Sequence, residues 1–207
     1  MINSFLKKIQ KRMGFAPLPP IATISDYIAY ADKQAAFVSQ VSLYTYIKTR
    51  AGTQWPKLFE DETYLVSMKI ARWHIFGAAV ADLALYLGAM MVKRNAATPE
   101  QALKISENVI TSILNDYDQD DIPQKDFKAM MKDGLARCQK ADWLDLAEGP
   151  NAFQSSADAL IRWTPIADEL KELDEEIVRN SIHMRWINVR RDIKDTLDAD
   201  AVMASAS

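Results

Sequence analysis

The chain has few of the residues on which most catalytic and metal sites depend. Its 207 residues include two histidines, one cysteine and six glycines. The single cysteine excludes an internal disulfide and a cysteine-ligated metal cluster, and it fits a reducing compartment. His74 and His183 belong to no His-Glu-x-x-His or Glu-x-x-His pattern, so zinc-protease and di-iron helical sites have no support. We therefore expect no metal and no cofactor.

The chain also lacks the motifs of nucleophilic catalysis and of phosphate binding. No Gly-x-Ser-x-Gly sequence occurs, and the glycines are too scattered to form a phosphate-binding loop. Cys138 follows Leu135 and Met131 at helical spacing, which favours a small buried thiol over a nucleophile.

One acidic segment resembles the beginning of a calcium-binding loop. Asp116, Asp118 and Asp120 have the alternate spacing of the first calcium ligands. However, Asp121 stands where such a loop needs glycine, and Phe127 stands where it needs a bidentate glutamate. We interpret the segment as an acidic, solvated loop.

Acidic residues are absent from the first fifteen positions, which instead carry a cluster of positive charge. The basic residues are Lys7, Lys8, Lys11 and Arg12. Apolar residues recur every three or four positions, so a helix would gather them on one face: Ile2, Phe5, Leu6, Ile9 and Met13. A basic amphipathic helix of this kind can lie on an anionic bilayer or dock on a partner protein.

We interpret residues 1–20 as a basic amphipathic arm followed by a proline-rich linker, because Pro17, Pro19 and Pro20 separate it from the rest. Its predicted membrane- or partner-binding residues are Phe5, Leu6, Lys7, Lys8, Ile9, Lys11, Arg12 and Met13. Without the arm, 21 basic residues face 28 acidic ones, a net charge of about −7. This acidic remainder argues against nucleic acid as a partner, although the arm could also fold back onto it.

Turn signals divide residues 21–200 into about six helices, and no strand-like alternation competes with them. The first, with Ser25 and Asp26 as its N-cap, spans about 25–50, and the second about 61–95. Thr98, Pro99 and Gln101 form a capping signal for a third helix, which ends near Leu114. The remaining helices are expected at about 124–140, around 153–161, and from Thr164-Pro165 toward Leu197.

The second helix contains a stretch, 73–92, that is nearly all apolar and close to bilayer length. Arg72 and Lys93 flank it, but Asp82 lies in its middle and would cost about 3 kcal/mol inside a membrane. We interpret it as the central helix of a bundle, apolar on all sides, and keep a membrane span as the alternative. Small residues would let its neighbours approach closely: Gly77, Ala81, Ala84 and Gly88.

His74 and Asp82 are the catalytic candidates. They lie eight residues apart on one helix, about two turns and 80° around its axis, so they cannot touch. Each needs a partner from another helix if buried, for example Arg50, Tyr44, Tyr46 or a residue of the last helix. An Asp–Arg pair that fixes helix packing is the favoured interpretation. A polar pocket, with His74 as base and Asp82 orienting a substrate, is the alternative.

The last helix is acidic in its early turns and basic in its late ones, an order that complements the helix dipole. Its apolar residues predict one long buried face, with the members Ile166, Leu170, Leu173, Ile177, Val178, Ile182, Trp186, Val189 and Ile193. We place Trp186 in the core rather than at a membrane or partner interface. The end of the chain, 201–207, is expected to fray.

These patterns predict an all-α protein: an irregular bundle of about six helices around a central apolar helix, with a short amphipathic N-terminal helix. The favoured function is a non-enzymatic adaptor or assembly factor. It would be cytoplasmic and attached to the inner face of a membrane, with an anionic lipid surface or a membrane protein as partner. One alternative is a small all-α enzyme or carrier, hydrolase-like or lipid-binding, with a polar pocket around His74 and Asp82. Another is a soluble protein–protein interaction module.

Overall fold

The computed structural model describes residues 18–117 and 122–206, and these residues are almost entirely helical. The α-helices are α2 (Ile24–Ala51), α3 (Glu62–Lys93), α4 (Pro99–Asn115), α5 (Gln124–Gln139), α6 (Trp143–Glu148), α7 (Gln154–Trp163), α8 (Asp168–Thr196) and α9 (Ala199–Ser205). Two 3-10 helices connect neighbouring α-helices: η1 (Gly52–Glu60) lies between α2 and α3, and η2 (Pro150–Phe153) lies between α6 and α7. The predicted all-α bundle is confirmed.

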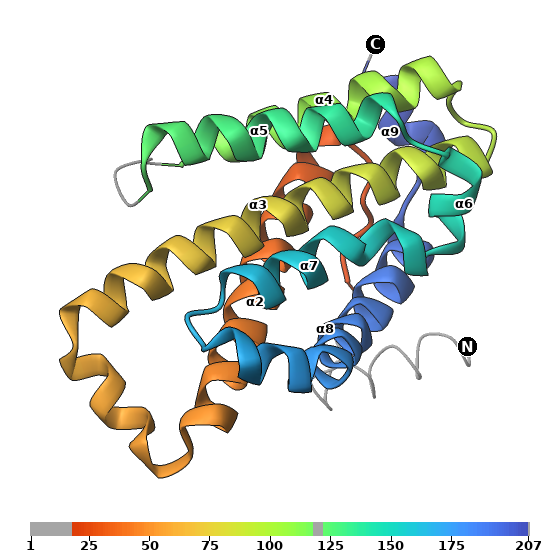
Figure 1. Ribbon diagram of the computed structural model, residues 1–207. Helices are drawn as coiled ribbons and strands as arrows, with labels where there is room; N and C mark the ends of the chain where they lie inside the picture. The colour runs from red at the N-terminus through yellow and green to blue at the C-terminus, as the bar shows by residue number, and fades with distance from the viewer. Residues whose placement is uncertain (1–17, 118–121, 207) are drawn as a thin grey trace.

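The long helix α3 runs through the middle of the bundle, with α2, α4, α5, α6 and α7 packed around it (Figure 1). By length and composition α3 could cross a membrane, but its own chain buries 89% of its most apolar window. A helix covered on all sides needs no polar face, which explains the continuous apolar run. The predicted central apolar helix is confirmed, and its burial favours a core helix over a membrane span.

Close helix packing around α3 depends on its small residues, as predicted. A Cβ atom at Gly88 would lie 2.6 Å from both Ser106 Oγ and Trp143 Cζ3, while one at Gly77 would overlap the Met130 side chain. The Ser106 hydroxyl also donates a hydrogen bond to the Ala84 carbonyl at 2.9 Å. Helices α4, α5 and α6 therefore approach the backbone of α3 directly.

The N-termini of α4 and α2 are both fixed by capping boxes. Thr98 and Gln101 form the predicted capping box of α4. The Thr98 amide donates to Gln101 Oε1 at 2.9 Å, and the Gln101 amide donates to Thr98 Oγ1 at 3.3 Å. Helix α2 begins slightly earlier than expected, because Thr23 rather than Ser25 is its N-cap and forms a capping box with Asp26.

The end of the chain differs from the predicted frayed segment, because residues through Ser205 form α9. Asp198 caps this short helix by accepting a hydrogen bond from the Ala201 amide at 3.1 Å, and Val202 is fully buried. The Ser205 hydroxyl accepts a hydrogen bond from the Ile24 amide at 3.0 Å. Packing against the start of α2 thus orders a segment whose composition alone favoured disorder.

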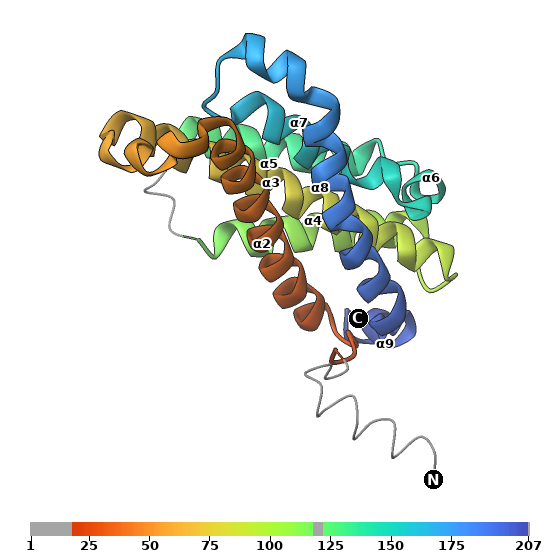
Figure 2. The ribbon, with the colours of Figure 1, turned by 90° about the horizontal axis from the view of Figure 1, so that it is seen from below.

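The two ends of the described body are joined by a short backbone bridge. The Ile21 amide donates to the Thr196 carbonyl at 2.9 Å, and the Asp198 amide donates to the Ile21 carbonyl at 2.9 Å. Ile21 and Leu197 form a parallel bridge, and both are buried. Helices α2 and α8 consequently converge near α9 (Figure 2).

The predicted single buried face of α8 is wrong for its first half. The residues that face the core are Val178, Ile182, Trp186, Val189 and Ile193. Leu170, Leu173 and Ile177 are instead 40%, 79% and 71% exposed. They lie on the opposite side of the helix, so α8 carries one buried and one exposed apolar face.

Candidate functional site

The arm residues predicted to bind a membrane or a partner lie between Phe5 and Met13, outside the described residues, so that site stays a prediction. The described chain begins at Leu18, three residues before Ile21. Because Ile21 is bonded to the end of α8, the arm is attached beside the junction of α2, α8 and α9.

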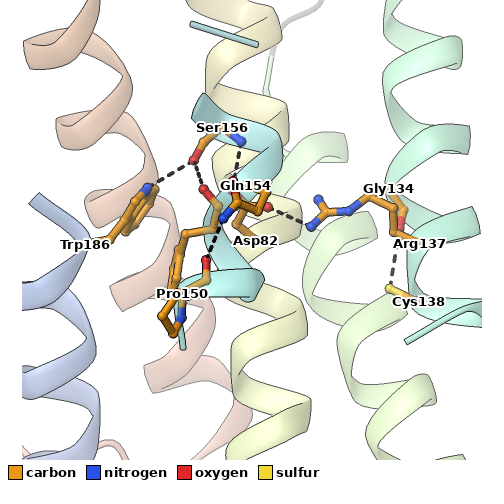
Figure 3. A network of polar contacts seen from close by, with 9 residues as sticks. Asp82, Gly134, Arg137, Cys138, Pro150, Gln154, Ser156 and Trp186 are labelled. Carbon is orange, nitrogen blue, oxygen red and sulfur yellow. Dashed lines mark hydrogen bonds and ion pairs between the residues drawn. The ribbon is translucent and has the colours of Figure 1, made fainter. Parts of the chain in front are cut away.

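Asp82 is fully buried, and both of its carboxylate oxygens accept hydrogen bonds from other helices (Figure 3). Oδ1 accepts from Arg137 Nη2 of α5 at 2.8 Å, and Oδ2 accepts from the Ser156 amide of α7 at 2.8 Å. The Ser156 hydroxyl in turn accepts from Trp186 Nε1 of α8 at 3.0 Å. One carboxylate therefore links α3 to α5 and α7 directly and to α8 through Ser156.

The electrostatics of Asp82 are those of a structural buried charge. Burial raises the pKa of this carboxyl above its ordinary value, while Arg137 and the Ser156 hydrogen bond lower it. Trp186 is 1% exposed, so the prediction that it belongs to the core is confirmed. Because Asp82 is 0% exposed and each of its oxygens already accepts a hydrogen bond from another helix, a substrate cannot reach this carboxylate.

Asp82 does form the expected pair with an arginine, but the arginine is Arg137 and not the predicted Arg50. Arg50 of α2 pairs with Asp174 of α8 instead, and Asp174 also accepts a hydrogen bond from the Tyr46 hydroxyl at 3.1 Å. The true partner, Arg137, lies one turn after Gly134 and two turns after Met130, beside the buried stripe of α5. A basic residue at the edge of an apolar helical stripe was the signal that could have identified it.

His74 is held by an aromatic stack rather than by a carboxylate. Its ring lies parallel to Trp163 of α7, with 3.5 Å between centroids and 3° between planes, and Arg162 lies 5.4 Å from the Trp163 ring. Nε2 is buried and has no hydrogen-bond partner among the described residues. Burial lowers the pKa of His74, and Arg162 lowers it further against the opposing effect of Asp126. The imidazole is therefore neutral at neutral pH.

A cleft of about 440 Å³ lies beside His74, between α3, α5 and α7. Its charged lining residues are Asp126, Asp133, Asp158, Arg137 and Arg162. Charges of both signs suit a polar ligand and disfavour a lipid tail. Asp82 does not line the cleft, so the two predicted catalytic residues are not brought together.

The remaining chemical candidates are structural in the part of the chain that the structure describes. Cys138 is 2% exposed, its thiol donates to the Gly134 carbonyl at 3.5 Å, and burial raises its pKa to about 12. The prediction of a small buried thiol is therefore confirmed. No group of three His, Cys, Asp or Glu residues within the described ranges is arranged for a metal ion. Asp118 and Asp120 lie outside those ranges.

The described chain is thus an all-α bundle with an occupied polar network at its centre and a polar cleft on one side. No protein-family model matches the chain, and neither does any curated protein or solved structure.

Proposed function

We propose that this protein is a non-enzymatic adaptor or assembly factor, held at the cytoplasmic face of a membrane by residues 1–17. The observation that carries the proposal is the separation of charge along the chain. The first fifteen residues are basic and apolar, and the remainder is acidic. Each cation near an anionic leaflet contributes about 1 kcal/mol of attraction, while the acidic remainder is repelled.

The described body supports an adaptor more than an enzyme. Asp82 has both oxygens occupied by Arg137 and Ser156, and His74 stacks on Trp163 with no carboxylate partner. Neither arrangement supplies an activated nucleophile or a base–orienter pair. The bridge between Ile21 and the end of α8 gives the arm a fixed attachment point, which suits a tether.

Vesicle sedimentation with the full-length protein tests the proposal. The binding variant replaces the four arm cations Lys7, Lys8, Lys11 and Arg12 with glutamine. Its matched control removes the same number of charges from exposed positions of the body: Lys125, Lys128, Lys132 and Lys140. We expect phosphatidylserine vesicles to pellet the wild-type protein and the control but not the arm variant. Equal pelleting of all three, or of none, contradicts the proposal.

A shorter chain beginning at Leu18 gives a second comparison, because it keeps Ile21 and its hydrogen bonds to the end of α8. We expect this chain to fold and to stay in the supernatant. The arm could instead bind a protein, either a membrane protein or the partner that the interaction-module alternative requires. In both cases the full-length protein should stay in a complex with that partner after detergent has removed the lipid, whereas attachment to lipid alone should be lost.

The cleft beside His74 favours one second candidate, a protein that binds a small polar molecule. Buried Nε2 without a partner is a hydrogen-bonding group that a ligand could satisfy. Amide NMR spectra recorded with a fragment library should then show shifts near His74 and Arg137 that disappear in His74→Ala. Fragments that shift neither region exclude this candidate.

A further inference from the structure

The exposed apolar residues of α8 follow the alternating four- and three-residue spacing of a coiled-coil seam. Leu173 and Ile177 are 79% and 71% exposed, and Met184 and Ile187 are 65% and 52% exposed. We define the outer seam as Leu170, Leu173, Ile177, Asn180, Met184 and Ile187. Steps of this kind place every member on one face, as the a and d positions of a heptad.

Most of the outer seam lies outside the packed core of its own bundle; Leu170 is 40% exposed, and Ile177 borders a hollow between α2, α7 and α8. At 100° per residue the centre of the seam lies about 170° around α8 from the buried face of Val178, Ile182 and Trp186. Figure 2 shows α8 crossing the underside of the molecule with no other described helix in front of it. Apolar side chains gathered on one open face are typical of a protein–protein contact.

Charge along α8 changes sign at the middle of the outer seam. Six acidic residues precede this point: Asp168, Glu169, Glu172, Asp174, Glu175 and Glu176. One basic residue, Lys171, also precedes it. Five basic and two acidic residues follow it: Arg179, Arg185, Arg190, Arg191, Lys194, Asp192 and Asp195. The net charge is therefore −5 before this point (six acidic, one basic) and +3 after it (five basic, two acidic). The change falls between Glu176 and Arg179, and the seam's own midpoint lies between Ile177 and Asn180. The helix is therefore complementary to an antiparallel copy of itself.

Much of this charge makes no ion pair within the bundle. Among the described residues, Glu169, Glu172 and Glu176 have no ion-pair partner, and the same holds for Arg191 and Lys194. An antiparallel second copy would place each set near its opposite, whereas a parallel copy would place like charges together.

We propose that two copies of this chain pair antiparallel through the outer seam, about a two-fold axis between Val178 and Arg179. Leu173 then meets Met184 of the partner subunit, and Leu170 meets Ile187 of the partner subunit. Asn180 lies next to the axis, where a polar residue within an apolar seam specifies register and orientation. A two-fold contact of this kind is self-complementary and closed.

The charge distribution favours a second copy over the other occupants. The basic arm could lie against the acidic half of α8, but Met184 and Ile187 are flanked by Arg185, Arg190 and Arg191, which would repel it. An anionic membrane would be repelled by the acidic half for the same reason. Dimerisation is independent of the arm's proposed membrane role, and either can fail without the other.

Sedimentation equilibrium of the full-length protein tests the pairing. We expect a mass of twice the 23.4 kDa chain that falls toward the monomer on dilution. Leu173→Glu should weaken association about tenfold or more, because it buries two charges against apolar side chains. Leu144→Glu, at a 65% exposed position of α6, is the control and should dimerise normally. A monomeric wild-type protein, or equal effects of both substitutions, overturns the proposal.

Single-cysteine cross-linking tests the orientation, since native Cys138 is buried. Two Asn180→Cys side chains would be offset by about 4.5 Å along an antiparallel pair, whereas two Leu173→Cys side chains would be offset by about 16 Å. A short thiol cross-linker should therefore join Asn180→Cys chains and leave Leu173→Cys chains separate. Efficient joining of both indicates a parallel pair, and joining of neither indicates that the arm or another molecule covers the seam. Each of these results overturns the proposal.

Discussion

At the scale of single residues, Asp82 shows how a charge becomes structural. It is 0% exposed, and its two oxygens accept hydrogen bonds from the Arg137 guanidinium and the Ser156 amide. Removing one partner of such a network leaves the others buried without acceptors, which costs more than the intact network contributes. The sequence predicted that Asp82 needs a partner from another helix. The edge of the apolar stripe of α5 marks Arg137 as a candidate, but the pairing with Asp82 could not be predicted, because which helices adjoin α3 depends on tertiary packing.

Asp82→Ala should lower the free energy of unfolding by about 3–5 kcal/mol, measured by urea denaturation. The control is Asp158→Ala. Asp158 also pairs with an arginine, Arg179, but its side chain is 62% exposed. Surface pairs of that kind contribute about 0–1 kcal/mol. Similar losses in the two variants would show that the central network does not hold the bundle together.

Two histidines should make stability depend on pH. Burial is the main cause that lowers the pKa of both His74 and His183 in the folded state. A lowered folded pKa means that the unfolded chain binds protons first, so this contribution is present above about pH 6.5 and is lost as the pH falls. The free energy of unfolding should therefore decrease from about pH 7.5 to pH 5.5.

Replacing either ring with one that does not titrate tests this origin. His74→Phe keeps an aromatic ring beside Trp163, and it should flatten part of the pH slope. His183→Phe should remove a further part, and the double variant should remove most of it. Urea titrations at a series of pH values measure the slope, and an unchanged slope in the double variant would assign it to other groups.

At the scale of helices, local signals predicted the elements well and their orientation less well. The capping box at Thr98 and Gln101 and the proline breaks are local, so they located the long helices. The short helices α6 and α9 carry too few residues for a clear period and depend on packing. In α8, residues on both faces recur at three- and four-residue steps, so periodicity could not show that Leu173 points outward.

The space around Gly88 and Gly134 determines how replacing each of them with alanine changes stability. A Cβ at Gly88 would meet Ser106 and Trp143 at 2.6 Å, whereas the nearest atom to a Cβ at Gly134 would be that of Ala81 at 3.5 Å. Gly88→Ala should therefore destabilise the protein by about 1–3 kcal/mol through overpacking. Gly134→Ala should stabilise it by about 0.5–1 kcal/mol through helix propensity. Thermal and urea unfolding measure both, and equal signs would contradict the packing of α3.

At the scale of the whole molecule, the apolar composition of α3 was what predicted its position at the centre of the bundle. It is the long helix with an apolar residue on nearly every side, so its central place followed from the need to cover it. The candidate cleft could not be predicted in the same way, because Trp163 and Arg137 come from α7 and α5. Only the folded arrangement brings those two helices together beside His74.

The separation of charge between arm and body gives a prediction about salt. If lysine attraction holds the arm on anionic lipid, the fraction pelleted with phosphatidylserine vesicles should fall steeply between about 50 and 300 mM salt, as the Debye length shrinks. Binding to neutral vesicles should be weak at either concentration. A salt-insensitive pellet would assign attachment to the apolar residues of the arm alone.

The bridge at Ile21 has a mechanical consequence. A load on the arm reaches the body first at Ile21, where two backbone hydrogen bonds hold the chain to Thr196 and Asp198. The Thr23–Asp26 box that follows is local to the start of α2 and does not depend on that clasp. We therefore expect a pulling force on the arm to break this two-bond bridge before α2 unfolds, because α2 is packed against the bundle along its length.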